Sequence, residues 1–236
     1  MRGDHQPFSP TELAQLERCE SQVLFDQRFG AQRSKHWQKR SAEGRAVHAR
    51  MHRDVTAPSP QGKKRMLIVA IIIALVALML IILALRGDQR STDVLLPIEL
   101  QGAELWASEK TLIRQKPVHI RGRPDEVWLK DGRRTIIETK SRDGRVFAGD
   151  RMQLAAYAYL LRGDGGPPVA PVAYVRFTGG EISFSRVRLK PEEDVIAAHR
   201  RLSALKAGKA EPRFAGHAAL CKGCGHRERC ASPRAA

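Results

Sequence analysis

The sequence predicts an α/β fold, a mixed sheet flanked by helices, because strand-forming and helix-forming segments alternate along the chain. An amphipathic segment, residues 150–163, predicts a helix that ends at a glycine, and residues 191–208 predict a second helix with acidic residues at its start. Strand candidates surround the first helix and precede the second. They are residues 94–100, 105–106, 112–113, 118–121, 127–129, 135–137, 172–177 and 182–189.

The N-terminal part contains two helical segments. Ser9 is in the position of an N-cap, Pro10 follows it, and Glu12 completes a capping box. Residues 33–53 are basic, and their second part, which contains His48, is expected to be helical. A single histidine in a basic helix is most often solvated, so His48 by itself predicts no ligand.

The clearest hairpin of the chain lies within residues 123–142. Asp131 and Gly132 are typical of a two-residue type I′ turn, which requires positive φ at both positions. The flanking segments are rich in β-branched and aromatic residues. With this turn, Lys130 pairs with Arg133, and the register of the whole hairpin follows.

Counting outward in that register, Asp125 lies opposite Glu138, and Lys140 shares their face of the sheet. Two carboxylates so close repel each other unless a cation lies between them. A divalent metal with oxygen ligands suits such a site. The alternative is a surface hairpin with a cross-strand Glu–Lys ion pair.

The chain is strongly basic, with 41 Lys and Arg against 25 Asp and Glu and a net charge of +16. The excess is spread along the chain, which favours a polyanionic partner, either DNA or an anionic membrane surface. Aromatic residues make up only 6% of the chain, so composition does not indicate a stacking platform for single strands.

Four cysteines predict a structural metal site. Cys221, Cys224 and Cys230 have C-x2-C-x5-C spacing, and Cys19 is the remaining cysteine. Four thiolates hold either a tetrahedral zinc ion or an iron–sulfur cluster, and the spacing does not separate the two. Two disulfides are the alternative.

Residues 66–85 are all Ala, Val, Ile, Leu or Met, after a linker at 57–65. A helix of this length spans about 30 Å, the thickness of a bilayer core. The segment therefore predicts one inserted transmembrane helix and a single-pass membrane protein. Such a helix would separate His48 from Asp125, and the flanking charges would place the N-terminal part in the cytoplasm and the later part outside. We expect a cytoplasmic active site, because DNA and iron–sulfur assembly are there.

Several motifs in order resemble those of the PD-(D/E)XK nuclease superfamily, RecB-like branch. The cysteines are similar to the iron–sulfur staple of a subgroup that includes the CRISPR-associated exonucleases, to which the chain is closest in size. The matching motifs are Gly44 with His48, Pro124-Asp125, Glu138-Thr139-Lys140, Gln153 with Tyr157, and Cys19 with Cys221, Cys224 and Cys230.

The resemblance implies a restriction-endonuclease-like sheet and a role for each matching residue. Mg²⁺ or Mn²⁺ would be bound by His48, Asp125, Glu138 and the carbonyl of Thr139. The catalytic set would be Asp125, Glu138, Lys140, Gln153 and Tyr157, with Lys140 acting on the attacking water. Tyr157 in plain helix packing is the alternative for that residue. The four cysteines would hold a [4Fe-4S] cluster, with zinc as the alternative.

The function implied is a membrane-associated, metal-dependent DNA exonuclease on single strands, with protein partners or a homo-oligomer also open. The alternatives are a non-catalytic membrane-anchored nucleic-acid-binding protein and a lipid-binding platform. The expected division of the chain is a helical N-terminal part of the nuclease domain (1–56), the linker and transmembrane helix (57–90), the nuclease core (91–214) and the cysteine segment (215–236).

Overall fold

A five-stranded sheet organises the part of the chain that the computed structural model describes, residues 7–32, 44–53 and 95–232. Its strand order is β1-β4-β5-β6-β7, and only the β5–β6 pair is parallel. A separate two-stranded sheet is formed by β2 and β3. The strands are β1 (Glu104–Ser108), β2 (Leu112–Arg114), β3 (Ile120–Gly122), β4 (Glu126–Lys130), β5 (Arg133–Lys140), β6 (Val172–Phe177) and β7 (Ser183–Arg188).

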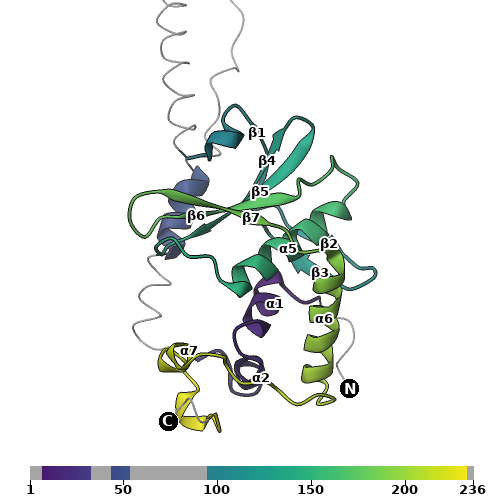
Figure 1. The fold of residues 1–236 in the computed structure, drawn as a ribbon. Coiled ribbons are helices and arrows are strands. Elements are labelled where there is room, and N and C mark those ends of the chain that lie inside the picture. Colours follow the sequence, from purple (N-terminus) through teal and green to yellow (C-terminus); the bar gives the residue numbers. More distant parts are fainter. Residues whose placement is uncertain (1–6, 33–43, 54–94, 233–236) are drawn as a thin grey trace, which may run out of the picture.

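Helices connect and cover this sheet (Figure 1). The helix α5 joins the parallel strands β5 and β6, as a β-α-β crossover requires. Residues 44–53 are also helical. The other elements are α1 (Pro10–Leu16), α2 (Glu20–Phe29), η1 (Ile98–Leu100), α5 (Ala148–Arg162), α6 (Glu192–Lys206), α7 (Ala218–Lys222) and η2 (Arg227–Arg229).

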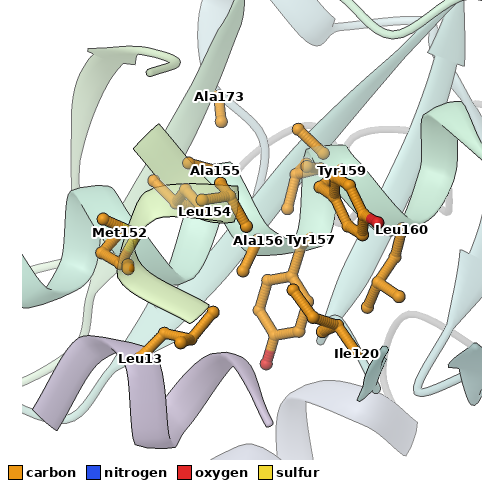
Figure 2. Packing of buried hydrophobic residues seen from close by; sticks show 14 of the residues in the cluster. Leu13, Ile120, Met152, Leu154, Ala155, Ala156, Tyr157, Tyr159, Leu160 and Ala173 are labelled. Carbon is orange, nitrogen blue, oxygen red and sulfur yellow. The ribbon is translucent and has the colours of Figure 1, made fainter. Parts of the chain in front are cut away.

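The core lies between one face of the sheet and α5, which is buried over almost its whole length. Figure 2 shows α5 side chains packed against Leu13 of α1 and Ile120 of β3. Ala155, Ala156 and Ala158 are fully buried, and their small size lets neighbouring elements approach the helix closely. A smaller cluster on Trp128, Ile137 and Tyr174 includes Leu96 and Leu100, which come from the segment before β1.

Two local signals are confirmed in detail. The Ser9 hydroxyl accepts a hydrogen bond from Glu12 N at 3.1 Å, and the Glu12 carboxylate accepts one from Ser9 N at 2.9 Å. Asp131 and Gly132 both have positive φ, 48° and 69°, and Lys130 pairs with Arg133 as the turn predicts. These features depend on neighbouring residues only, which is why the sequence predicts them.

The strand expected at 94–100 is wrong, because residues 98–100 form the 3₁₀ turn η1. Pro97 precedes this turn and has no backbone N–H to contribute to a sheet ladder. The segment is apolar because Leu96 and Leu100 are buried.

The predicted mixed sheet with flanking helices is present in the described residues. No helix among residues 7–32, 44–53 and 95–232 is long and apolar enough to cross a membrane. The helices α5 and α6 have 15 residues each, about 22 Å, against roughly 30 Å of hydrocarbon core. This finding contradicts two predictions, the inserted transmembrane helix and the single-pass membrane localisation. The segment 66–85 lies outside the described residues.

Segments from the two ends of the chain meet at Glu20, the first residue of α2. Its buried carboxylate accepts hydrogen bonds from Arg201 on α6 and from Arg213 beyond it, the shortest at 2.6 Å to each. Burial raises the pKa of Glu20, but these arginines outweigh it and lower the pKa to about 2. This contact ties α2 to the C-terminal part. The division of the chain at residues 56, 90 and 214 stays a prediction.

Candidate active site

The end of β5 carries three of the predicted site residues, Glu138, Thr139 and Lys140. Strand β5 is central in the sheet, so these residues lie against β4 on one side and β6 on the other. Asp125 comes directly before β4, where continuation of the observed register places it opposite Glu138. The hairpin turn therefore decides that two carboxylates from distant positions meet.

His48 reaches the same point from the helical segment 44–53. Its Nδ1 lies 3.4 Å from Asp125 Oδ2, and the same oxygen accepts a hydrogen bond from Thr139 N at 2.8 Å. A Cβ on Gly44 would lie 2.6 Å from Ser141 Oγ, so the helix packs closely on the end of β5. The separation of His48 from Asp125 that a membrane-crossing helix would impose is thus not observed.

Lys140 is held by two acceptors. Its Nζ donates to Glu138 Oε1 at 2.8 Å and to Gln153 Oε1 at 2.9 Å. Gln153 in turn donates through Nε2 to Glu138 Oε1 at 2.8 Å and to the Tyr157 hydroxyl at 3.1 Å. Helix α5 supplies Gln153 and Tyr157 one turn apart, so both side chains face β5. Tyr157 also packs in the core, as Figure 2 shows, so both expectations for this residue describe part of its environment.

The site favours added positive charge. Burial, followed by the negative charge of Asp125, raises the pKa of Glu138 to about 7. The hydrogen bond with Asp125 raises the pKa of His48. Burial lowers the pKa of Lys140, but the charge of Glu138 outweighs it and the net direction is upward. Burial also raises the pKa of Tyr157 well above its usual value, so its hydroxyl stays protonated.

Glu138 Oε2 is buried and has no hydrogen-bond partner among the described residues. An unpaired carboxylate oxygen beside Asp125 and His48 is a donor set that fits a divalent cation. In the described residues, no group of three or more His, Cys, Asp or Glu side chains is already arranged to hold a metal ion. The metal ligands therefore stay a prediction.

Sequence reasoning missed the buried ion pair behind the site. Arg176 on β6 is fully buried and pairs with Glu126 on β4, and its Nη1 also donates to Thr139 Oγ1 at 3.2 Å. Trp128 Nε1 donates to the same glutamate at 2.8 Å. The pair fixes Thr139, whose N–H holds Asp125. An arginine in an otherwise apolar strand was the available signal.

The four cysteines come together where the start of α2 meets the C-terminal segment. Cys19, Cys221, Cys224 and Cys230 are free thiols and line one small cavity. Burial, and also the nearby Cys230, raises the pKa of Cys19, although hydrogen bonds from backbone N–H groups oppose the shift. The four thiols line one cavity and no disulfide joins them in the described residues, and the metal that they would hold stays a prediction. The four thiols are not arranged around a common point as metal ligands would be in the part of the chain that the structure describes.

A second contact in this region was also missed. His226, between Cys224 and Cys230, is fully buried, and its Nε2 lies 2.6 Å from Asp26 Oδ1 on α2. Gln15 donates to the other oxygen of that carboxylate at 2.6 Å. The C-terminal segment is thus fixed on α2 by protein contacts as well.

Comparison with known proteins gives one family. The model of the PD-(D/E)XK nuclease superfamily matches residues 7–231. Among solved structures, one described as the crystal structure of SSO0001 is similar, at 19% sequence identity and a TM-score of 0.47. That match covers 98% of this chain and 88% of the other chain. A search of curated proteins finds no match.

Proposed function

Because the chain belongs to the PD-(D/E)XK nuclease superfamily, we propose that it is a metal-dependent DNA exonuclease acting on single-stranded ends. Members of this superfamily are nucleases, so phosphodiester hydrolysis follows from membership. The main support for a hydrolytic site is that His48, Asp125 and Glu138 converge beside Lys140. The RecB-like branch and the relation to CRISPR-associated exonucleases belong to the proposal, and rest on the order of the motifs.

The metal site of this proposal consists of His48, Asp125, Glu138 and the carbonyl of Thr139. What supports it is the unpaired Glu138 Oε2 and the raised pKa of that carboxyl, which burial and Asp125 cause. Mg²⁺ or Mn²⁺ bound there would polarise a phosphoryl oxygen and lower the pKa of the attacking water.

Lys140 has the position to orient the water and to stabilise negative charge on the phosphate. Its ammonium is aimed by two acceptors, so little reorganisation is required when charge develops. Gln153 fixes the relative position of Lys140 and Glu138 by hydrogen bonds to both, and the Tyr157 hydroxyl accepts a further hydrogen bond from Gln153. The backbone N–H of Thr139 fixes the Asp125 carboxylate.

The cysteine cavity is proposed as a structural [4Fe-4S] site, with zinc as the alternative occupant. Four thiols lining one cavity are a donor set that fits either. The group would supply a covalent tie between α2 and the C-terminal segment, and no step of the hydrolysis passes through it. Absorbance near 400 nm in protein purified without oxygen supports the cluster, whereas a colourless protein with stoichiometric zinc contradicts it.

The test of the nuclease function uses the purified full chain and end-labelled DNA with Mn²⁺, Mg²⁺ or EDTA. Linear and circular single strands separate exonuclease from endonuclease action, and duplex DNA tests strand preference. Lys140→Ala is expected to lose about 100-fold or more of the rate. Lys130→Ala is the matched control. This lysine lies at the turn end of the same hairpin and donates to the backbone carbonyls of Glu99 and Gln101. Absence of metal-dependent cleavage by folded protein would refute the proposal.

A further inference from the structure

The loop 141–147 joins the two catalytic elements, β5 with Lys140 and α5 with Gln153. It ends at Phe147, which occupies the N-cap position of α5. Phe147 is 49% exposed, unusual for a large apolar side chain next to a buried helix. No contact of the hydrolytic site explains this exposed ring.

The loop is firmly held. A Cβ on Gly179, in the β6–β7 turn, would lie 2.5 Å from the carbonyl carbon of Arg142, so the two backbones touch. The Asp150 carboxylate accepts from Phe147 N at 2.8 Å and pairs with the Arg142 guanidinium. Arg142 Nη2 also donates to Arg145 O at 3.2 Å. Phe147 is therefore presented on a fixed backbone, which lowers the entropy lost when a ligand binds.

Cations surround the ring. The guanidinium carbons of Arg142 and Arg145 lie 4.8 and 5.8 Å from its centroid. Arg142 also lies 5.5 Å from the ring of Phe177, which pairs with Lys140 across the sheet. The negative charge of Asp150, which fixes Phe147 N, acts on Lys140. Arg142, which contacts the exposed ring, thus lies at the C-terminal ends of β5 and β6, where Lys140 is.

We infer that Phe147 stacks on an unpaired base of the substrate strand next to the cleaved phosphate, while Arg142 and Arg145 contact the adjacent backbone. The inference rests on the proposed nuclease function and specifies its substrate class. Aromatic rings accept any base because every base has a π-face, and guanidinium groups neutralise phosphate. A base in a duplex is already stacked on both faces, so the ring selects an unpaired strand. One well-placed ring does this although aromatics are few in the chain.

The first experiment measures kcat and KM on linear single-stranded DNA for Phe147→Ala and Phe147→Trp. Phe147→Ala is expected to raise KM by about 5- to 20-fold, at the lower end of the range for a base–aromatic stack, because the ring is half exposed. Its kcat should change less than KM, and Phe147→Trp should restore KM. Unchanged KM in Phe147→Ala, with the parent chain active, overturns the inference and leaves the nuclease function standing.

Phe29→Ala is the matched control, because this ring is 42% exposed and has Arg28 and Arg229 at 5.3 Å, but lies on α2. It should leave KM unchanged. An equal rise in KM would mean that the place beside Lys140 has no special role, and would overturn the inference.

A second readout needs no cleavage. Binding of a labelled single strand and of a strand of the same length made only of abasic residues is compared in EDTA. The parent chain should prefer the strand with bases by about fivefold, and Phe147→Ala should lose that preference. This preference in a protein that cleaves no DNA would support the stacking and refute the nuclease function. Its retention in Phe147→Ala overturns the inference.

Discussion

Gln153 offers the sharpest test of how the site works, because its one amide group contacts three other side chains. It accepts from Lys140 at 2.9 Å, donates to Glu138 at 2.8 Å and donates to the Tyr157 hydroxyl at 3.1 Å. Gln153→Leu keeps the size of this buried side chain but removes all three hydrogen bonds. Lys140 then keeps Glu138 as its remaining anchor among these residues.

The magnitude follows from the bond to the ammonium. A hydrogen bond to a charged group contributes about 1.5–3 kcal/mol, and Lys140 loses one of its two. A loss of about 2 kcal/mol in transition-state stabilisation lowers the rate of cleavage about 30-fold. Tyr157→Phe removes only the hydroxyl that holds Gln153 and leaves Lys140 with both acceptors. Its rate should fall less than about fivefold, because the lost bond joins neutral groups.

The assay is single-turnover cleavage of end-labelled DNA at saturating protein, which separates the chemical step from binding and product release. Thermal melting of both variants checks that the fold is kept. A folded Gln153→Leu protein that cleaves within about threefold of the parent would show that Gln153 does not position Lys140. A rate in Tyr157→Phe as low as in Gln153→Leu would show that the hydroxyl acts on the substrate directly.

Two further predictions concern stability. The pKa of Glu20 is about 2 in the folded chain, so its stabilisation is present above the usual carboxyl pKa of 4.5 and is lost as pH falls from there toward 2. Glu20→Gln should therefore lower the free energy of unfolding at pH 7 by about 1–2 kcal/mol, less than the pKa shift alone implies, because Arg213 is mostly exposed and Arg201 partly so. The urea midpoint of this variant should depend less on pH between 5 and 3 than that of the parent, while Glu17→Gln nearby should change little. Gly179→Ala should lower thermal stability by about 1–3 kcal/mol, because its Cβ would meet the backbone of Arg142. The adjacent Gly180→Ala, which meets only a side-chain oxygen at 3.3 Å, should be mild, and equal melting temperatures for the two glycine variants would contradict the reasoning.

The sequence by itself determined the features whose causes are local. The capping box of Ser9 and Glu12 needs only residues three apart. The Asp131-Gly132 turn requires positive φ, and this turn alone sets the register that brings Asp125 to Glu138. The C-x2-C-x5-C spacing likewise predicted that the cysteines lie close together, because thiolates at this spacing bind one metal ion or cluster jointly.

Tertiary structure decided what depends on the packing of distant segments. Whether His48 reaches Asp125 depends on how the helical segment 44–53 packs on β5, where Gly44 permits a close approach. The hydrophobicity of residues 66–85 predicted the reverse, a membrane between His48 and Asp125. Hydrophobicity along the sequence contains no information about contacts between distant segments.

The same holds for charge and exposure. Arg176 stands out in the sequence only as one arginine in an apolar strand, and its partner Glu126, two strands away in the sheet, is known only from the fold. Phe147 is one apolar residue among many, and only the fold leaves its ring exposed and close to the guanidinium groups of Arg142 and Arg145. Side-chain chemistry is fixed by the sequence, but burial and neighbours set what that chemistry does, and both are properties of the folded chain.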